Sequence, residues 1–154
     1  MIKVLFVCHG NICRSPMAEY LLKAMVEKNG IADQFFIASA ATSTEEIGNP
    51  VHSGTQRVLR SIGISCEGKR AVQIRKYDYN SYDYIIGMEN VNVKNIIKAV
   101  GSDPEGKVYR LLDFTDKPRD IDDPWYTGKF DDTYKEIYEG CIGFLKHLRV
   151  QGMI

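Results

Sequence analysis

A thiol and a guanidinium stand at the two ends of one short segment near the start of the chain. Cys8 follows an apolar run, residues 2–7, that is typical of a buried strand, and Arg14 lies just before Pro16, where a helical pattern begins. Unpaired N–H groups at a helix start can bind a tetrahedral oxyanion and favour a thiolate, and an arginine can hold two oxygens at once. We interpret the segment as an oxyanion site with a nucleophile. The alternative is a buried cysteine beside a surface arginine.

The loop of this site is predicted to consist of His9, Gly10, Asn11, Ile12, Cys13, Arg14 and Ser15. Gly10 and Asn11 tolerate positive φ, which would curl the loop so that successive N–H groups converge on one point. His9 would contribute mainly its backbone N–H.

Three side chains of this loop have two open interpretations each. Asn11 braces the loop through side-chain hydrogen bonds, or it is a surface turn residue. Ser15 donates to the Cys8 thiolate or caps the helix that begins at Pro16, and the two roles are compatible. Cys13 forms a disulfide with Cys8 if the loop is tightly curled, or it is a buried structural thiol.

An acidic residue directly before a proline, Asp123 before Pro124, is the candidate general acid. Proline restricts the preceding residue to extended conformations, which would hold the carboxyl group at a defined angle. The adjacent Asp122 and the aromatic residues Trp125 and Tyr126 would keep Asp123 protonated often enough to serve a leaving group. An ordinary Asp-Pro turn is the alternative, and the two aromatic residues line a slot or pack in the core.

The order of the predicted elements indicates the fold. Apolar runs predict strands at residues 2–7, 35–38, 82–88 and 107–112. Helical periodicity predicts helices from Pro16 to Asn29, from Pro50 to Ile62, over 93–100 and over 134–148. Residues 65–80 predict a short helix or irregular structure, and residues 39–49 and 112–129 are predicted loops. This alternation favours an α/β fold with a parallel sheet covered on both faces, and ligands of such sheets bind where the loop after Cys8 must lie.

Composition narrows the class of protein. The 154 residues fit one domain, so we expect residues 1–154 to form a single domain. Twenty basic and twenty acidic residues leave no basic field for nucleic acid, and the apolar runs are far shorter than the ~20 residues that span a bilayer. The histidines lack metal-site spacing, and the cysteines do not fit a secreted disulfide scaffold. We therefore expect a cytoplasmic protein with reduced thiols and no metal.

Two stretches resemble the signatures of one enzyme family. Residues 7–19, VCHGNICRSPMAE, resemble the signature of the low-molecular-weight protein tyrosine phosphatases, and residues 122–126, DDPWY, are similar to that family's second signature. Residues 82–88, YDYIIGM, resemble the family's third strand. The resemblance spans essentially the whole chain. It implies a flavodoxin-like three-layer sandwich, with a four-stranded parallel sheet and helices on both faces.

The resemblance also implies the roles of individual residues. Cys8 would be the nucleophile, Arg14 would hold the phosphate, and Asp123 would be the general acid of a phosphatase that needs no cofactor. The supporting residues implied by the resemblance are Asn11 and Ser15, for the loop and the thiolate, and Cys13, as the partner of Cys8 in a reversible protective disulfide.

This chain departs from the family pattern where substrate preference is decided. Residues 41–45, Ala-Thr-Ser-Thr-Glu, stand where members usually carry Gly-Thr-x-x-Trp; His9 replaces a common Leu, and Glu89 replaces a frequent Asp. The acidic Glu45 would favour peptides with Lys or Arg near the phosphotyrosine. The predicted wall of the substrate site consists of Glu45, Trp125 and Tyr126.

The expected substrates are phosphotyrosine-containing proteins or peptides, hydrolysed through a cysteinyl-phosphate by a monomer or weak homo-oligomer. Protein arginine phosphatases also resemble the chain, but they carry Thr where the apolar Ile12 stands. Arsenate reductases of related architecture need two further redox cysteines, and Cys66 and Cys141 are not paired along the chain. A non-enzymatic phosphate-binding module would need no general acid, and the presence of Asp123 argues against it.

Overall fold

Four parallel strands form the centre of the molecule, and the computed structural model describes all 154 residues, Met1–Ile154. The strands are β1 (Ile2–Cys8), β2 (Phe35–Ala41), β3 (Tyr84–Gly87) and β4 (Val108–Arg110), in the spatial order β2-β1-β3-β4. All three neighbouring pairs are parallel, and β1 pairs with β2 over its whole length. The predicted four-stranded parallel sheet is confirmed.

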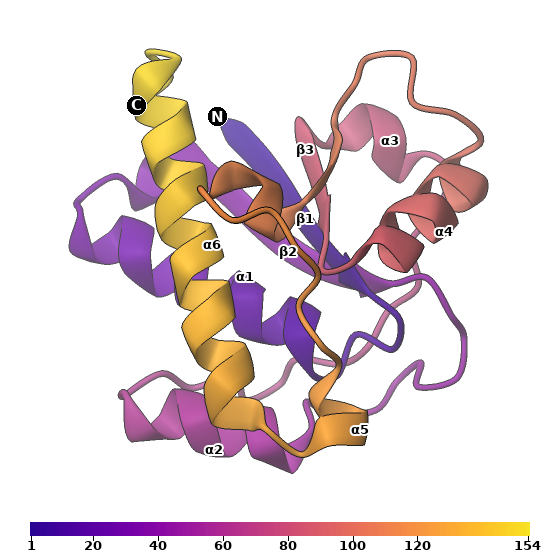
Figure 1. Ribbon diagram of the computed structural model, residues 1–154, viewed down its shortest axis with the longest axis vertical. Coiled ribbons are helices and arrows are strands. Elements are labelled where there is room, and N and C mark those ends of the chain that lie inside the picture. Colours follow the sequence, from indigo (N-terminus) through magenta and orange to yellow (C-terminus); the bar gives the residue numbers. More distant parts are fainter.

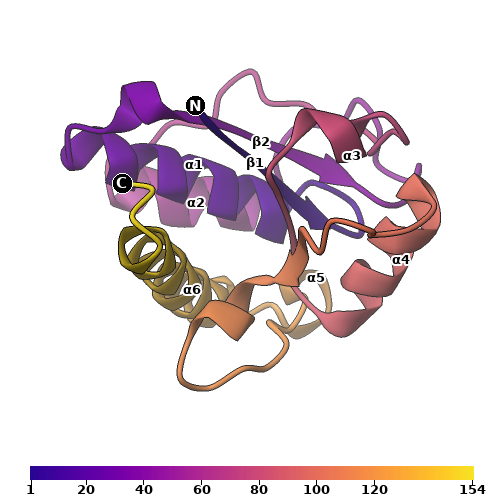
Figure 2. The ribbon, with the colours of Figure 1, turned by 90° about the horizontal axis from the view of Figure 1, so that it is seen from above.

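Helices cover both faces of this sheet, as the sequence predicted. One face carries α1 (Arg14–Lys28), α2 (Ser53–Ser61) and α6 (Phe130–Val150), and the other carries α3 (Asp78–Ser81) and α4 (Asn90–Val100), as Figure 1 and Figure 2 show. The remaining elements are the short helix α5 (Pro124–Thr127) and two 3₁₀ turns, Ala32–Gln34 and Leu111–Phe114. The arrangement is the flavodoxin-like three-layer sandwich.

The central strand β1 is buried on both faces, which is usual for a parallel sheet. Val4 and Phe6 pack in the core that includes α1, α2 and α6, whereas Leu5 and Val7 pack in the smaller core that includes α3 and α4. The apolar residues of the run 2–7 therefore pack alternately into the cores on the two faces of the sheet. It ends at Cys8, on the edge of the sheet formed by the carboxyl ends of the strands.

The second predicted helix begins later than expected. The prediction placed its start at Pro50, but α2 begins at Ser53. Pro50 instead forms an isolated antiparallel bridge with Arg70. His52 occupies the N-cap position, and its Nδ1 accepts a hydrogen bond from the Gly54 N–H at 3.0 Å. Because histidine is not a preferred capping residue, no local signal marked this start.

The fourth strand is shorter than the predicted 107–112. Leu111 and Leu112 lie in a 3₁₀ turn instead, and both are fully buried. Leu111 packs so closely on α6 that a Cβ added at Gly140 would lie 2.5 Å from its Cγ. The apolar character of these two residues thus reflects burial beneath α6. The loop predicted for 112–129 also contains α5.

Candidate active site

The loop between β1 and α1 owes its curl to Asn11. Asn11 has a φ of 58° and is the only non-glycine residue with positive φ, so the prediction for this residue is confirmed. Gly10 does not have positive φ, and that part of the prediction was wrong. A Cβ at residue 10 would lie 3.3 Å from Cγ of Glu46. Glycine at this position therefore permits the close approach of Glu46.

The thiol of Cys8 is buried and receives two polar contacts. Ser15 Oγ lies 3.1 Å from Cys8 Sγ, and the Asn11 backbone N–H donates to the same sulfur at 3.3 Å. Hydrogen-bond donors stabilise a thiolate more than a thiol. Ser15 does not cap α1, because the helix begins at Arg14, Cys13 holds the N-cap position and no side chain caps the helix. Of the two interpretations of Ser15, the geometry supports contact with Cys8.

Asn11 is only 1% exposed, and its side chain forms hydrogen bonds with three residues. Its Nδ2 donates to Ser15 Oγ at 2.8 Å and to Ser39 Oγ, on β2, at 2.9 Å. Its Oδ1 accepts a hydrogen bond from the Val72 N–H at 3.1 Å. The interpretation of Asn11 as a surface turn residue was wrong, and its bracing of the loop agrees with the alternative.

A buried carboxylate that sequence analysis did not identify ends this series of hydrogen bonds. Ser39 Oγ donates to Glu19 Oε1 at 2.5 Å, and Glu19 lies on the buried face of α1. Lys23 Nζ is 2.6 Å from Glu19 Oε2, and Lys69 Nζ is 3.8 Å from Oε1. Burial lowers the pKa of Lys69, although the Glu19 carboxylate opposes this effect. The sequence signal for Glu19 was its position as the last residue of the stretch 7–19 that resembles the family signature.

Arg14 is 1% exposed, so the interpretation of a surface arginine was wrong. Its Nη1 donates to Glu89 Oε2 and to the Ile121 carbonyl oxygen, both at 2.8 Å, and its Nη2 lies 3.3 Å from Asp123 Oδ2. Burial alone would lower the pKa of Arg14, but Cys8, Asp123 and Glu89 raise it, so the guanidinium stays charged. Arg14 Nε is the one buried side-chain nitrogen or oxygen without a hydrogen-bond partner.

Asp123 is both a capping residue and a member of the site. Its Oδ1 accepts a hydrogen bond from the Trp125 N–H at 3.0 Å and so caps α5, while Oδ2 faces Arg14. Its backbone is extended, with φ −75° and ψ 114°, as Pro124 requires. Oδ1 therefore makes the contact expected of an Asp-Pro turn, while Oδ2 lies beside Arg14, where the candidate general acid is expected.

A pocket of about 110 Å³ lies between Cys8 and Asp123, which both line it. Trp125 and Tyr126 are 55% and 83% exposed, so neither is a core residue. The Trp125 ring contacts His52 edge-on, with 5.6 Å between ring centroids. The residues that line the pocket are Cys8, His9, Gly10, Ile12, Cys13, Glu45, Glu46, Asp123, Trp125 and Tyr126. All three residues of the predicted substrate wall are among them.

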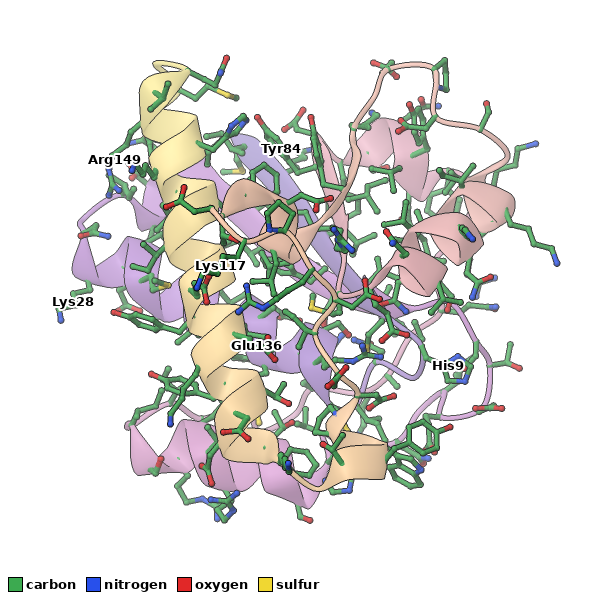
Figure 3. The ribbon with its side chains drawn as sticks, in the orientation of Figure 1. His9, Lys28, Tyr84, Lys117, Glu136 and Arg149 are labelled. Carbon is green, nitrogen blue, oxygen red and sulfur yellow. The ribbon has the colours of Figure 1, made fainter.

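The rim of the pocket carries a hydrogen-bonded contact between His9 and Glu45 that sequence analysis missed. His9 Nε2 lies 2.7 Å from Glu45 Oε2, and both side chains are exposed. Figure 3 shows His9 projecting from the surface on the side of the molecule away from α6. The expectation that His9 contributes mainly its backbone N–H was therefore incomplete. Glu46 lines the same pocket, so the rim is acidic.

All four cysteines are free and buried. Cys13 lines the same pocket as Cys8, and burial, together with the neighbouring Cys8, raises the pKa of the Cys13 thiol. Cys141 lies in the core beneath α6, where burial raises the pKa of its thiol to about 12. Cys66 lines a different pocket. Neither Cys66 nor Cys141 lines the pocket at Cys8.

The structure contains no group of three or more His, Cys, Asp or Glu side chains arranged to hold a metal ion. None of its helices combines the length and the apolar composition that a membrane span requires.

Comparison with known sequences identifies one family. The sequence profile described as low molecular weight phosphotyrosine protein phosphatase matches residues 3–153. The low molecular weight protein-tyrosine-phosphatase YfkJ of Bacillus subtilis is 41% identical over 143 residues, which are 92% of each chain. The corresponding phosphatase PtpA of Staphylococcus epidermidis is 35% identical over 149 residues, 96% of this chain and 94% of that protein.

Solved structures of several protein phosphatases have the same fold as this chain. The crystal structure of YfkJ has a TM-score of 0.93 at 40% identity and covers 98% of this chain and 96% of that one. The phosphatase SP-PTP from Streptococcus pyogenes has a TM-score of 0.86 at 43% identity, covering 96% and 93%. A drosophila arginine phosphatase has a TM-score of 0.86 at 31% identity, covering 96% and 98%. The chain belongs to the family of low molecular weight phosphotyrosine protein phosphatases.

Proposed function

We propose that this chain hydrolyses phosphotyrosine monoesters in proteins and peptides through a cysteinyl-phosphate at Cys8. The observation that carries the proposal is that three reactive groups lie close together, two of them in the wall of one pocket. The Cys8 thiol lines this pocket together with Asp123, whose Oδ2 is 3.3 Å from the Arg14 guanidinium. Membership of the phosphotyrosine phosphatase family supports the same chemistry.

In the first step the Cys8 thiolate attacks phosphorus, so that an S–P bond forms as the bond from phosphorus to the tyrosine oxygen breaks. Arg14 and the N–H groups of the loop stabilise the negative charge on the three equatorial oxygens. The unpartnered Nε of Arg14 supports this role, because it is a buried donor that a phosphate oxygen would satisfy. Asp123 gives its proton to the departing phenolate.

In the second step water attacks the cysteinyl-phosphate. Asp123, now ionised, accepts a proton from that water, and the S–P bond breaks to release inorganic phosphate. Cys8 leaves as a thiolate, which Ser15 Oγ at 3.1 Å stabilises. Each group needed for nucleophilic attack, charge stabilisation and proton transfer thus comes from the chain, and the proposed reaction uses no cofactor.

The substrate preference follows from the lining of the pocket. Ile12 presents only carbon atoms beside the loop, and Trp125 with Tyr126 offers aromatic surface, a combination that suits an aryl ring. Glu45 and Glu46 make the rim acidic, which favours basic residues near the phosphotyrosine. The phosphorylated guanidinium group of phosphoarginine would have no hydroxyl group at residue 12 with which to form a hydrogen bond.

We further propose that residues 1–154 act as one phosphatase domain on cytoplasmic phosphoproteins, as a monomer or weak homo-oligomer without nucleic acid or membrane partners. The equal numbers of acidic and basic residues support the absence of nucleic acid binding.

The test compares turnover of otherwise identical peptides that carry phosphotyrosine, phosphoserine or phosphoarginine, together with arsenate plus a thiol donor. We expect hydrolysis of the phosphotyrosine peptide above all others. Acid quenching during turnover, followed by mass spectrometry, should locate a phosphoryl group on Cys8. The variant Cys8→Ser should keep its circular dichroism spectrum and lose turnover. Preferred hydrolysis of phosphoarginine, or appreciable turnover by Cys8→Ser, contradicts the proposal.

A further inference from the structure

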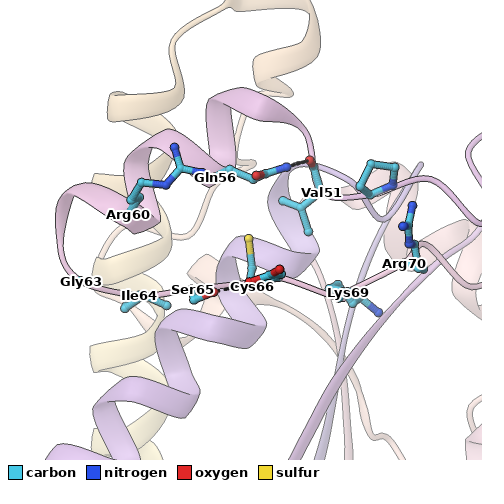
Figure 4. Close-up of a pocket in the computed structure, with 12 residues that line it drawn as sticks. Val51, Gln56, Arg60, Gly63, Ile64, Ser65, Cys66, Lys69 and Arg70 are labelled. Atoms are coloured by element: carbon cyan, nitrogen blue, oxygen red, sulfur yellow. Dashed lines mark hydrogen bonds between the residues drawn. The ribbon is translucent and has the colours of Figure 1, made fainter.

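A second pocket, of about 650 Å³, lies between α2 and the segment 63–70, away from Cys8. Figure 4 shows Gln56 and Arg60 on the helix side and the chain from Gly63 to Arg70 on the opposite side. Its volume falls within the roughly 300–1,000 Å³ that is common for small-molecule sites. None of its lining residues belongs to the pocket at Cys8. The molecule therefore offers a separate cavity large enough for a small ligand.

The charge of this pocket is positive. Arg60, Lys69 and Arg70 line it, and the only acidic side chain in its wall is Glu67. Arg60 and Arg70 are exposed and pair with no carboxylate, and the one contact of the Arg70 guanidinium is 3.5 Å to the Gly48 carbonyl oxygen. Guanidinium groups that are free of internal partners are available to hold a phosphate or a carboxylate in bidentate fashion.

The neutral groups of the pocket also suit a polar ligand. The Cys66 sulfur points toward α2 in Figure 4, and burial raises the pKa of this thiol, so it remains neutral and adds no negative charge. Gln56 and Ser65 add amide and hydroxyl groups. An anionic ligand would meet these hydrogen-bonding groups as well as the unpaired guanidinium groups of Arg60 and Arg70.

The helix side of the pocket is connected to the catalytic loop. The backbone N–H of His52, the N-cap of α2, donates to the Ile12 carbonyl oxygen at 2.8 Å. Thr55, in the first turn of α2, is fully buried and donates through Oγ1 to the Cys13 carbonyl oxygen at 3.0 Å. A displacement of α2 would therefore move two peptide groups of the loop that binds phosphate.

The opposite side of the pocket is connected to the same loop. Lys69 Nζ donates to the Ser39 carbonyl oxygen at 3.0 Å, and Ser39 Oγ in turn accepts from Asn11 Nδ2. The Val72 N–H, shortly after the lining segment, donates directly to Asn11 Oδ1 at 3.1 Å. Both walls of the pocket thus hold residues of the catalytic loop by hydrogen bonds.

We propose that this pocket is an allosteric site for a small organic anion with two or more phosphate or carboxylate groups. Arg60 lies near the C-terminal end of α2, and Arg70 pairs with Pro50 before its N-terminal end, so the ligand must be long enough to contact both ends of the pocket. Such a ligand restrains both walls in the arrangement that supports Asn11, Ile12 and Cys13. An allosteric ligand acts by binding one arrangement better than another, and couplings of about 5-fold to 150-fold are typical. We expect binding to raise kcat. This effect on turnover, but not the binding itself, rests on the proposed phosphatase activity.

The test uses inositol hexakisphosphate and benzenehexacarboxylate as probes of the phosphate and carboxylate chemistries, because both carry anionic groups on opposite sides of a ring. Isothermal titration calorimetry is performed on the unmodified protein and on the variants Arg60→Gln, Arg70→Gln and Arg57→Gln. Arg57 is the matched control, because it lies on α2 and is exposed but does not line the pocket, and its ion pair with Asp131 is long, at 3.5 Å. We expect at least one probe to bind the unmodified protein and Arg57→Gln equally and the other two variants at least tenfold more weakly.

Turnover of a phosphotyrosine peptide completes the test. The probe that binds should raise kcat of the unmodified protein and of Arg57→Gln at least twofold, and should leave kcat of Arg60→Gln and Arg70→Gln unchanged. If the probe binds all four proteins with equal affinity, or if it only raises KM and does so equally in all four, the anion binds only at Cys8. Either result would overturn the proposal. Specific binding without a change in kcat would overturn the coupling. A lack of turnover without any probe would refute the phosphatase proposal and leave the calorimetric result valid.

Discussion

The substitution Glu89→Gln tests how strongly the orientation of Arg14 governs turnover. Glu89 Oε2 accepts a hydrogen bond from Arg14 Nη1 at 2.8 Å, where the arginine side chain is 2% exposed and the glutamate side chain 24%. Hydrogen bonds to charged groups contribute about 1.5–3 kcal/mol. Glutamine keeps an acceptor oxygen but loses the charge, so we take the lower value. Since ~1.4 kcal/mol corresponds to a factor of ten, kcat/KM should fall roughly tenfold.

The more severe substitution Glu89→Ala should have a larger effect on the same parameter. It removes both the charge and the acceptor, and leaves the buried guanidinium with only the Ile121 carbonyl and Asp123. A loss at the upper value of about 3 kcal/mol predicts a fall in kcat/KM of roughly 100-fold. The two variants should therefore form a graded series.

The assay measures kcat/KM on a phosphotyrosine peptide, together with the free energy of unfolding in urea. Both measurements are needed because Glu89 is also the N-cap residue of α4, so its loss should destabilise the fold as well. Asp113→Asn is the matched control, because it breaks an equally short ion pair with Arg110, at 2.8 Å, outside the catalytic pocket. The reasoning is refuted if both Glu89 variants keep kcat/KM within twofold of the parent, or if Asp113→Asn loses as much activity.

Three further substitutions test the other groups at the pocket. Asp123→Asn should lower kcat/KM roughly 100-fold or more for alkyl and unactivated aryl phosphates, and far less for strongly activated ones, since a good leaving group needs little protonation; equal losses for both would remove Asp123 from the acid role. Cys13→Ser should recover less activity than the parent when thiols are added after peroxide treatment, because the parent is protected from over-oxidation by a disulfide between Cys8 and Cys13 that mass spectrometry detects; equally full recovery would mean that this disulfide does not form. Burial raises the pKa of the Cys13 thiol, so little of it is thiolate at neutral pH, and the rate of disulfide formation in the parent should continue to rise through the alkaline range. Glu45→Gln should reduce the ratio of basic to acidic peptide turnover at low ionic strength by a factor equivalent to about 1 kcal/mol or less, and the difference should vanish in high salt; an unchanged ratio at low salt would exclude Glu45 from the substrate wall.

Features that depend on neighbouring residues could be predicted from the sequence. Cys8 and Arg14 are six positions apart, and a strand followed by a short loop and a helix leaves few ways to separate them. The apolar runs and helical stripes likewise predicted a parallel sheet covered on both faces, because each pattern reflects burial of one local element. Asp123 was identifiable as a candidate for the same reason, since Pro124 restricts its backbone directly, although the sequence left open whether it is a general acid or part of an ordinary turn.

Features that depend on which elements pack together required the tertiary structure. Glu89 and Ile121 contact Arg14 across sequence separations of 75 and 107 residues, because β3 lies beside β1 and the segment before α5 returns to the same edge of the sheet. Ser39 reaches Asn11, 28 positions away, because β2 pairs with β1 on its other side. No local pattern encodes such partners. The sequence gives the charge of each side chain, but the order of the strands determines how far that side chain lies from its partner.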